Sequence, residues 1–217
     1  MQAVLENMKA MHGLALPVME EFLTIQGEGF NTGKTAYFIR IGGCDVGCHW
    51  CDVKESWDEK IHPLKEINKI IDGVLQSGAK AVVVTGGEPT MYNLTNLTQL
   101  LRGNGIQLYL ETSGAYKITG EWDWVCLSPK KNMQTLPENY AKANELKVIV
   151  YNKDDFKFAE ANFTACMKEE NKMEQGCFFL QPEWSRRNEM LPLIVNYVQQ
   201  NPKWRISLQT HKYIGIP

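Results

Sequence analysis

Short apolar runs rich in valine, isoleucine and aromatic residues recur along the chain and predict a series of β-strands. Glycine, proline or asparagine residues bound most of these runs, as expected where a strand ends in a turn. The runs are TAYFIRI (35–41), KAVVVT (80–85), IQLYLE (106–111), WDWVCLS (122–128), LKVIVY (146–151), CFFLQ (177–181) and WRISLQ (204–209), with a further short strand expected in PVMEEFL (17–23).

Between several of these runs, apolar residues recur every three or four positions, which is the period of an amphipathic helix. Each stripe ends near a glycine or a proline, the residues that most often stop helices. Residues 153–168 show a weaker helical pattern. The three clear stripes are Leu64, Ile67, Ile71, Val74 and Leu75 before Gly78; Leu94, Leu97 and Leu101 before Gly103; and Leu191, Ile194, Tyr197 and Val198 before Pro202.

Strands that alternate with helices predict βαβ units and a mostly parallel sheet. A closed eight-stranded barrel usually needs roughly 250 residues, and only about 180 follow the first clear strand here. Only about 11 residues separate the strands at 106–111 and 122–128, too few for a packed crossover helix. We therefore expect an α/β fold in the form of an incomplete, partial TIM-like βα barrel. No repeat or linker divides the chain, so we expect a single domain.

The composition adds exclusions rather than a function. The 217 residues are 44% hydrophobic and 22% charged, with a formal net charge of −2, so no broad electrostatic attraction to nucleic acid or anionic lipid is expected. No apolar run approaches the roughly 20 residues that span a bilayer, and the N-terminus does not resemble a secretory signal. These features predict a soluble, cytoplasmic protein with neither nucleic acid nor membrane as a partner.

Three of the six cysteines lie within eight residues, at Cys44, Cys48 and Cys51. A secreted disulfide framework would be spread more evenly, so the cluster indicates a metal site in a reducing compartment. Three thiolates leave a structural zinc site short of a ligand, whereas a 4Fe–4S cluster held by three cysteines keeps one iron open for chemistry. Zinc with a further ligand, or free thiols, are the alternatives. Cys126 and Cys177 lie in apolar runs and are expected to be buried.

A second motif, Thr85-Gly86-Gly87-Glu88-Pro89, directly follows the predicted strand at 80–85. Paired glycines let backbone groups approach a ligand closely, although the same sequence is also typical of a simple strand-to-helix turn. Both motifs fall where parallel strands end, and the carboxyl ends of such strands form the functional edge of a βα fold.

The C-x3-C-x2-C loop, with Trp50 before its last cysteine, resembles that of the radical S-adenosylmethionine (SAM) superfamily, and the GGEP stretch resembles its SAM-binding motif. Further short matches resemble one family, the 7-carboxy-7-deazaguanine synthases, from about residue 17 to the end. They are Thr24–Gly29 (TIQGEG), Phe38-Ile39-Arg40, Cys51-Asp52, Glu111–Gly114 (ETSG), Ser128-Pro129-Lys130, Gln181-Pro182 and Leu208–Pro217 (LQTHKYIGIP). The resemblance therefore implies a radical SAM domain at 17–217, preceded by an N-terminal extension at 1–16.

This resemblance implies a lyase of queuosine biosynthesis that contracts the ring of 6-carboxy-5,6,7,8-tetrahydropterin, yielding 7-carboxy-7-deazaguanine and ammonia. It implies a 4Fe–4S cluster on the three cysteines, and SAM that is reused. The residues expected at the substrate are Ile25, Gln26, Gly27, Arg40, Thr85, Glu111, His211 and the terminal carboxylate of Pro217, and those at SAM are Gly87, Ser128, Pro129, Lys130, Gln181, Pro182, Glu183 and Trp184.

Several of these residue types suit such a substrate on chemical grounds. The forked guanidinium of Arg40 matches a carboxylate, and Glu111 is able to accept a pair of N–H donors from the guanidine-like edge of a pterin. Each residue also has a simpler interpretation: Arg40 as a surface ion pair, Glu111 and His211 as satisfied polar groups, and the last residues as a frayed tail.

One position departs from the family pattern. Many members carry a threonine after the Cys-Asp pair, where its hydroxyl binds a magnesium ion, whereas this chain has Val53. Valine offers no oxygen to a hard cation. We therefore expect that magnesium is absent or is held mainly by substrate and water.

The family resemblance also implies flavodoxin or ferredoxin as electron donor, and the exposed edges of an open barrel suggest a homodimer. Two other functions remain open from the sequence. A glycyl-radical-activating enzyme shares the cysteine loop but would consume SAM and act on a protein, and a metal-binding interaction module would have no activity.

Overall fold

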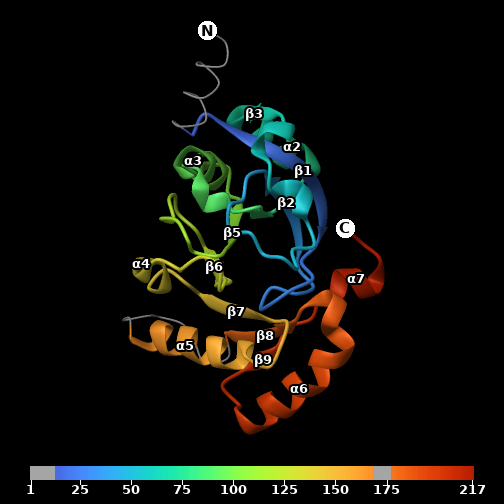
Figure 1. Ribbon diagram of the computed structural model, residues 1–217. Coiled ribbons are helices and arrows are strands. Elements are labelled where there is room, and N and C mark those ends of the chain that lie inside the picture. Colours follow the sequence, from blue (N-terminus) through green and yellow to red (C-terminus); the bar gives the residue numbers. More distant parts are fainter. Residues whose placement is uncertain (1–12, 169–176) are drawn as a thin grey trace.

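The computed structural model describes residues 13–168 and 177–217, and within them the strands form one sheet. The order across this sheet is β3-β1-β2-β4-β5-β6-β7-β8-β9, and the strands are drawn in Figure 1. The strands are β1 (Ala15–Ile25), β2 (Thr35–Ile41), β3 (Leu64–Glu66), β4 (Ala81–Gly86), β5 (Gln107–Thr112), β6 (Trp124–Leu127), β7 (Glu145–Val150), β8 (Phe178–Pro182) and β9 (Arg205–Ile206).

The sheet is parallel from β2 to β9, whereas β1 runs antiparallel to β2 and β3 antiparallel to β1. Strands β3 and β9 form its two edges and do not pair with each other, so the barrel stays open. The expected incomplete βα barrel is therefore confirmed. No helix lies between β5 and β6, as the short spacing in the sequence predicted.

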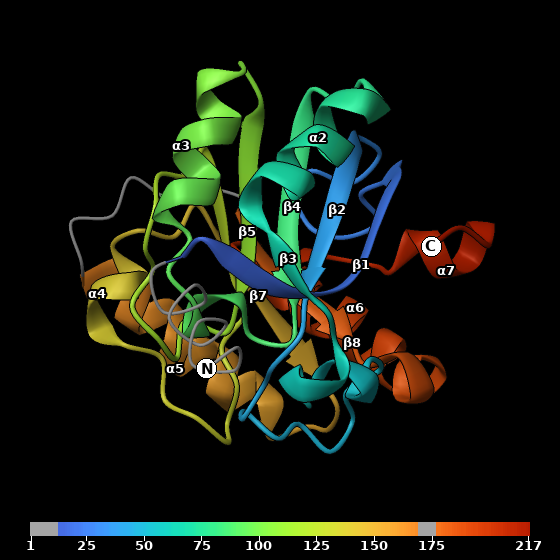
Figure 2. The ribbon, with the colours of Figure 1, turned by 90° about the horizontal axis from the view of Figure 1, so that it is seen from above.

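Helices cover the outer face of the sheet in two groups. Figure 2 shows α2 and α3 side by side against the strands that begin the parallel sheet, while α5 and α6 pack on β7 and β8. The helices are α2 (Ile67–Ser77), α3 (Thr95–Gly103), α4 (Pro137–Tyr140), α5 (Asp155–Lys168), α6 (Arg187–Gln200) and α7 (Thr210–Ile214), with short 3-10 turns η1 (Lys54–Ser56), η2 (Glu59–Ile61), η3 (Pro89–Met91) and η4 (Trp184–Arg186).

The core follows the alternation of the strands. One buried cluster joins Ile39, Val82 and Leu108 to apolar residues of α2 and α3. A second joins Leu146 and Leu180 to residues of α5 and α6. A third cluster, of Ala36, Phe38, Ala81, Val83 and Tyr109, covers the opposite face of the first parallel strands, so polar side chains gather at the carboxyl ends of the strands.

Several boundaries differ from those predicted. Leu64 belongs to β3 and not to the following helix, because it pairs with Pro17 of β1. The strand predicted at 204–209 pairs only at Arg205 and Ile206, since the Ser207 hydroxyl bonds Gly29 and Gln181 and the chain then enters α7.

The N-terminal boundary also falls earlier than expected. Strand β1 begins at Ala15, so residues 15 and 16 of the expected extension pair with β3, and Leu16 is buried. Residues 1–12 of that extension lie outside the described residues. Among the described helices, none combines the length and apolar character needed to cross a bilayer.

Candidate active site

A cavity of about 250 Å³ lies at the carboxyl ends of the parallel strands. Its lining includes all of the expected site residues except Pro129, although they are spread from residue 25 to residue 217. The gathered residues are Ile25, Gln26, Gly27, Arg40, Cys44, Cys48, Cys51, Thr85, Gly87, Glu111, Ser128, Lys130, Gln181, Pro182, Glu183, Trp184, His211 and Pro217. Their placement together supports a common site, and their individual roles remain predictions.

The cysteine loop follows β2 and is fixed by backbone hydrogen bonds. Gly43 donates its N–H to Ser56 at 2.7 Å, and Cys44 donates to Trp57 at 3.1 Å. Gly43 has φ = 100°, a conformation that side chains disfavour. The loop therefore needs glycine there to bring Cys44 to the pocket.

The three thiols fit a 4Fe–4S cluster. All three line the same cavity, are partly exposed and form no disulfide. Burial raises the pKa of Cys44 to about 11, so this thiol needs a bound cation such as iron in order to ionise near neutral pH. Within residues 13–168 and 177–217, no three His, Cys, Asp or Glu side chains converge on one metal ion. Three cysteine ligands in one loop suit a 4Fe–4S cluster with one open iron, and they leave a structural zinc site short of a ligand.

The glycine motif lies directly against this loop. Gly87 donates its N–H to Ile41 at 2.9 Å, and Glu88 donates to Gly43 at 2.8 Å. A Cβ atom on Gly87 would overlap the Gly43 carbonyl and the Cys44 side chain. The close approach of the two motifs therefore requires glycine at position 87, which a simple turn would not.

Glu88 connects the glycine motif to the end of β5. Its buried carboxylate accepts hydrogen bonds from the hydroxyl of Thr90 at 2.6 Å, and from the hydroxyl at 2.5 Å and the N–H at 2.8 Å of Ser113. The Thr112 hydroxyl donates to it as well, at 2.5 Å. Sequence analysis did not identify this role, because it depends on residues more than twenty positions away.

The residues expected at SAM form the wall beside the cysteine loop. The Lys130 ammonium donates to Ser128 Oγ at 2.7 Å and lies 6.0 Å from the centre of the Trp50 ring. Burial lowers its pKa, and the nearby Cys48 thiol opposes that shift. The Glu183 carboxylate accepts from the N–H groups at the start of η4. Pro129 lies between pocket residues without lining the cavity.

On the other side of the cavity, the expected substrate residues join two charged side chains that were not predicted. Gln26 Nε2 donates to Glu111 Oε1 at 2.7 Å, and Lys147 Nζ lies 3.4 Å from Glu111 Oε2. Lys147 also donates to Glu28, whose other oxygen accepts from Gln209 Nε2 at 2.8 Å. One signal in the sequence could have found Lys147: it is a lysine inside the otherwise apolar run LKVIVY. A lysine in a buried strand almost always has an acidic partner, so this position pointed to an ion pair.

Arg40 lines the cavity but also makes the surface ion pair that was its simpler interpretation. Its Nε lies 2.6 Å from Glu20 Oε1, and the Glu20 side chain is 43% exposed. An exposed ion pair of this kind stabilises a fold only slightly. The guanidinium is therefore available to a carboxylate that enters the cavity.

The last residues of the chain pack against the turn after β1 and do not form a frayed tail. Thr210 donates its N–H to Gly27 at 2.9 Å, and Thr24 Oγ1 donates to the Pro217 carbonyl at 3.1 Å. A Cβ atom on Gly27 would overlap the His211 ring. Burial lowers the pKa of His211, which favours the neutral imidazole at pH 7.

The surroundings of Val53 do not fit a magnesium site. Val53 lines the cavity but carries no side-chain oxygen. Asp52 Oδ2 accepts from Lys212 Nζ at 2.5 Å and from Gln209 Nε2 at 3.3 Å. Magnesium prefers several oxygen ligands in an octahedral arrangement, and here the carboxylate of the neighbouring Asp52 already has a cationic partner.

Comparisons with known proteins agree with this geometry. Residues 38–122 match the model of the radical SAM superfamily. A 7-carboxy-7-deazaguanine synthase from Flavobacterium psychrophilum is 57% identical over 94% of each chain, and the synthase from Escherichia coli K12 is 33% identical over 92% of this chain and 98% of its own. The crystal structure of QueE from Escherichia coli matches with a TM-score of 0.79 and 31% identity, over 94% of this chain and 97% of that one.

Proposed function

Because the chain belongs to the 7-carboxy-7-deazaguanine synthase family of radical SAM enzymes, we propose that its pocket converts 6-carboxy-5,6,7,8-tetrahydropterin to 7-carboxy-7-deazaguanine and ammonia in queuosine biosynthesis. The observation that supports this most strongly is the cavity itself. It unites three free thiols, the Gly87 motif and the Glu111 carboxylate at one sheet edge.

In this proposal Cys44, Cys48 and Cys51 hold the cluster and leave one iron open to SAM. When bound there, the cluster would supply the one-electron chemistry that activates SAM towards the substrate. Gly87 and the wall from Ser128 to Trp184 orient SAM. Glu88 joins the glycine motif, on the SAM side of the cavity, to the end of β5, on the substrate side. It therefore holds these two sides at a fixed distance from each other.

The substrate residues have complementary chemistry. Arg40 binds the substrate carboxylate through its guanidinium, while Glu111 accepts N–H donors of the pterin ring. The backbone of Ile25, Gln26 and Gly27, the Thr85 hydroxyl and the neutral His211 ring supply further hydrogen bonds at fixed positions. The main chain of Pro217, which accepts a hydrogen bond from Thr24, contributes from the same wall as Ile25, Gln26 and Gly27.

We further propose reduced flavodoxin or ferredoxin as the electron donor, and a homodimer as the assembly. The open sheet edges at β3 and β9 support a second copy as partner. Magnesium, if it takes part, would be held by substrate and water.

Anaerobic reconstitution with iron and sulfide tests the function. The loaded protein should absorb near roughly 400 nm, where thiolate-ligated clusters absorb, and dithionite, SAM and the carboxytetrahydropterin should then yield the deazaguanine acid without a matching accumulation of 5′-deoxyadenosine. Cys48→Ala should abolish the absorption and the turnover, whereas Cys166→Ala, a buried position on α5, should retain both.

Other outcomes would contradict the proposal in recognisable ways. One 5′-deoxyadenosine per event, with no product from the pterin, would indicate an activating enzyme. Zinc in place of iron in the purified protein would indicate an interaction module.

A further inference from the structure

Strand β7 presents one charged side chain, that of Lys147, to the cavity. Leu146, Val148 and Val150 of this strand point into the core beneath α5 and α6, while Lys147 and Ile149 line the cavity. The Lys147 side chain is only 4% exposed. A buried ammonium costs several kcal/mol unless it is paired, so its surroundings must offset that cost.

Two carboxylates supply the pairing. Lys147 donates to Glu28 and lies 3.4 Å from Glu111 Oε2. Burial opposes ionisation of Glu28, but attraction to Lys147 and hydrogen bonds from Lys147, Gln209 and Gln181 outweigh it and hold the Glu28 pKa at about 2. Burial lowers the pKa of Lys147, but nearby acidic groups, Glu111 and Glu28 among them, outweigh it and hold that pKa well above its ordinary value. The lysine is therefore cationic across the pH range of enzyme assays.

The contacts of Glu111 leave half of its carboxylate available. Gln26 occupies a site on Oε1 from one direction, and Lys147 faces Oε2 from another. A carboxylate has about four lone-pair sites, so each oxygen keeps one for a ligand. Glu111 thus offers two parallel acceptors to the cavity, and this edge matches the adjacent N–H donors at the 2-amino and N3 positions of a pterin.

We propose that Lys147, held by its counter-ion Glu28, is a positioning residue that fixes the orientation of Glu111 and so selects ligands with a 2-amino group. This inference rests on the proposed function, since it takes a pterin as the ligand. A lumazine, which has a carbonyl in place of the 2-amino group, places an acceptor against one oxygen of Glu111 and is disfavoured.

Equilibrium binding tests the selection without turnover. In the reconstituted protein with SAM, 6-carboxypterin should bind at least about tenfold more tightly than 6-carboxylumazine, the discrimination expected for a hydrogen bond to a charged group. Lys147→Met should reduce this ratio to about twofold or less, chiefly by weakening the binding of 6-carboxypterin. A Lys147→Met protein that keeps the full ratio would overturn the proposal.

Steady-state turnover separates positioning from a merely structural role. Lys147→Met should raise KM for the carboxytetrahydropterin by about tenfold or more, and leave cluster absorption and substrate-free SAM cleavage unchanged. Lys147→Arg should recover part of the loss, because it keeps the charge. An equal loss in substrate-free SAM cleavage would instead show a general structural defect.

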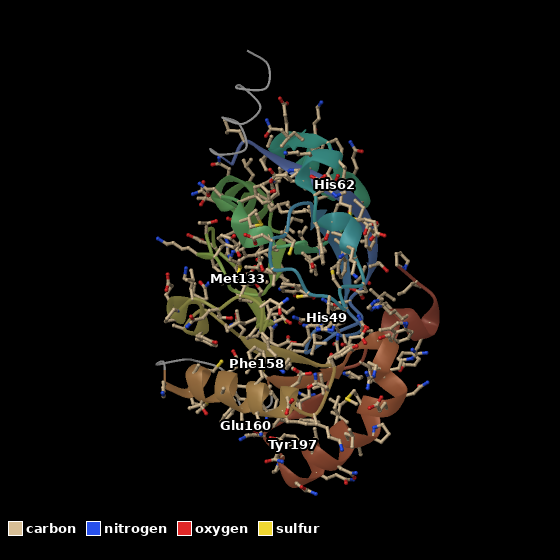
Figure 3. The ribbon with its side chains drawn as sticks, viewed as in Figure 1. His49, His62, Met133, Phe158, Glu160 and Tyr197 are labelled. Atoms are coloured by element: carbon tan, nitrogen blue, oxygen red, sulfur yellow. The ribbon has the colours of Figure 1, made fainter. Side chains whose placement is uncertain are left out.

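Two further proteins complete the design. Lys203→Met is the matched control: Lys203 pairs with Glu160 at 2.7 Å, and Figure 3 shows Glu160 and Tyr197 well away from His49 of the cysteine loop. It should behave as the wild type. If Lys147→Met fails to fold, Lys147→Met/Glu28→Gln removes both buried charges and takes its place in the binding test. A wild type that binds and turns over no pterin would refute the proposed function, whereas retained discrimination in the variant would refute only the role of Lys147.

Discussion

The side chain at position 53 determines which hard-cation ligands the cavity offers. Valine supplies none, and the neighbouring Asp52 is paired with Lys212. We therefore expect the turnover rate to change by less than about twofold between chelator-treated and magnesium-supplemented assays, because the cation has few oxygen ligands from the protein. Val53→Thr should gain a larger magnesium response. A strong, saturable magnesium requirement of the wild type would contradict this expectation.

Individual residues were predictable from the sequence where the chemistry itself demands the residue type. Three cysteines at fixed spacing and a pair of glycines are recognisable without a fold. Glu88 and Lys147 were missed because their roles arise only when distant strands meet. Both are charged residues within or just after an apolar strand run. This pattern is not specific, because it also occurs at surface positions and does not indicate which residue is the partner.

Among the elements, the parallel strands were predictable because both of their faces are covered and their sequences read as continuous apolar runs. Strand β2 was placed without error, and β4, β5 and β7 within one residue. Elements β3 and α7 were not predicted. Each is short and is stabilised by contacts with the N-terminal strand or the turn after it, so local periodicity carries no signal for them.

The packing of α7 leads to a prediction about the end of the chain. Thr24 binds the Pro217 carbonyl, and Pro217 lines the cavity. Residues appended after Pro217 should therefore lower kcat/KM for the pterin about tenfold or more, because they displace the proline and add bulk at the pocket wall. The same tag placed before Met1 serves as the control. Equal kinetic constants for the two tagged proteins would remove Pro217 from the site.

At the scale of the whole molecule, the open barrel brings both ends of the domain to one wall. Figure 1 shows α7 beside β1 and β2, near the end of β1. Between them, Gln209 links Glu28 of the first turn to Asp52 of the cysteine loop. The sequence predicted a mostly parallel sheet, and so placed the motifs at one edge, but it did not indicate this link, which depends on where the last strand leaves the sheet.

Because Glu28 is ionised in this network, the stability of the fold should fall as the pH becomes acidic. The pKa of Glu28 falls from 4.5 to about 2 in the folded chain, so its ionisation stabilises the fold fully above pH 4.5 and progressively less as the pH falls towards 2. Thermal unfolding of wild type and Glu28→Gln, followed by circular dichroism, should show a constant Tm difference from neutral pH down to about pH 5.

Below that pH the difference should shrink, because the unfolded chain takes up its proton first and the wild type alone loses the benefit of the charge. Glu138→Gln, an exposed position on α4, should follow the wild-type curve at every pH. If Glu28→Gln also runs parallel to the wild type down to pH 3, Glu28 does not carry the buried charge that balances Lys147, and the network around the cavity must be neutralised from elsewhere.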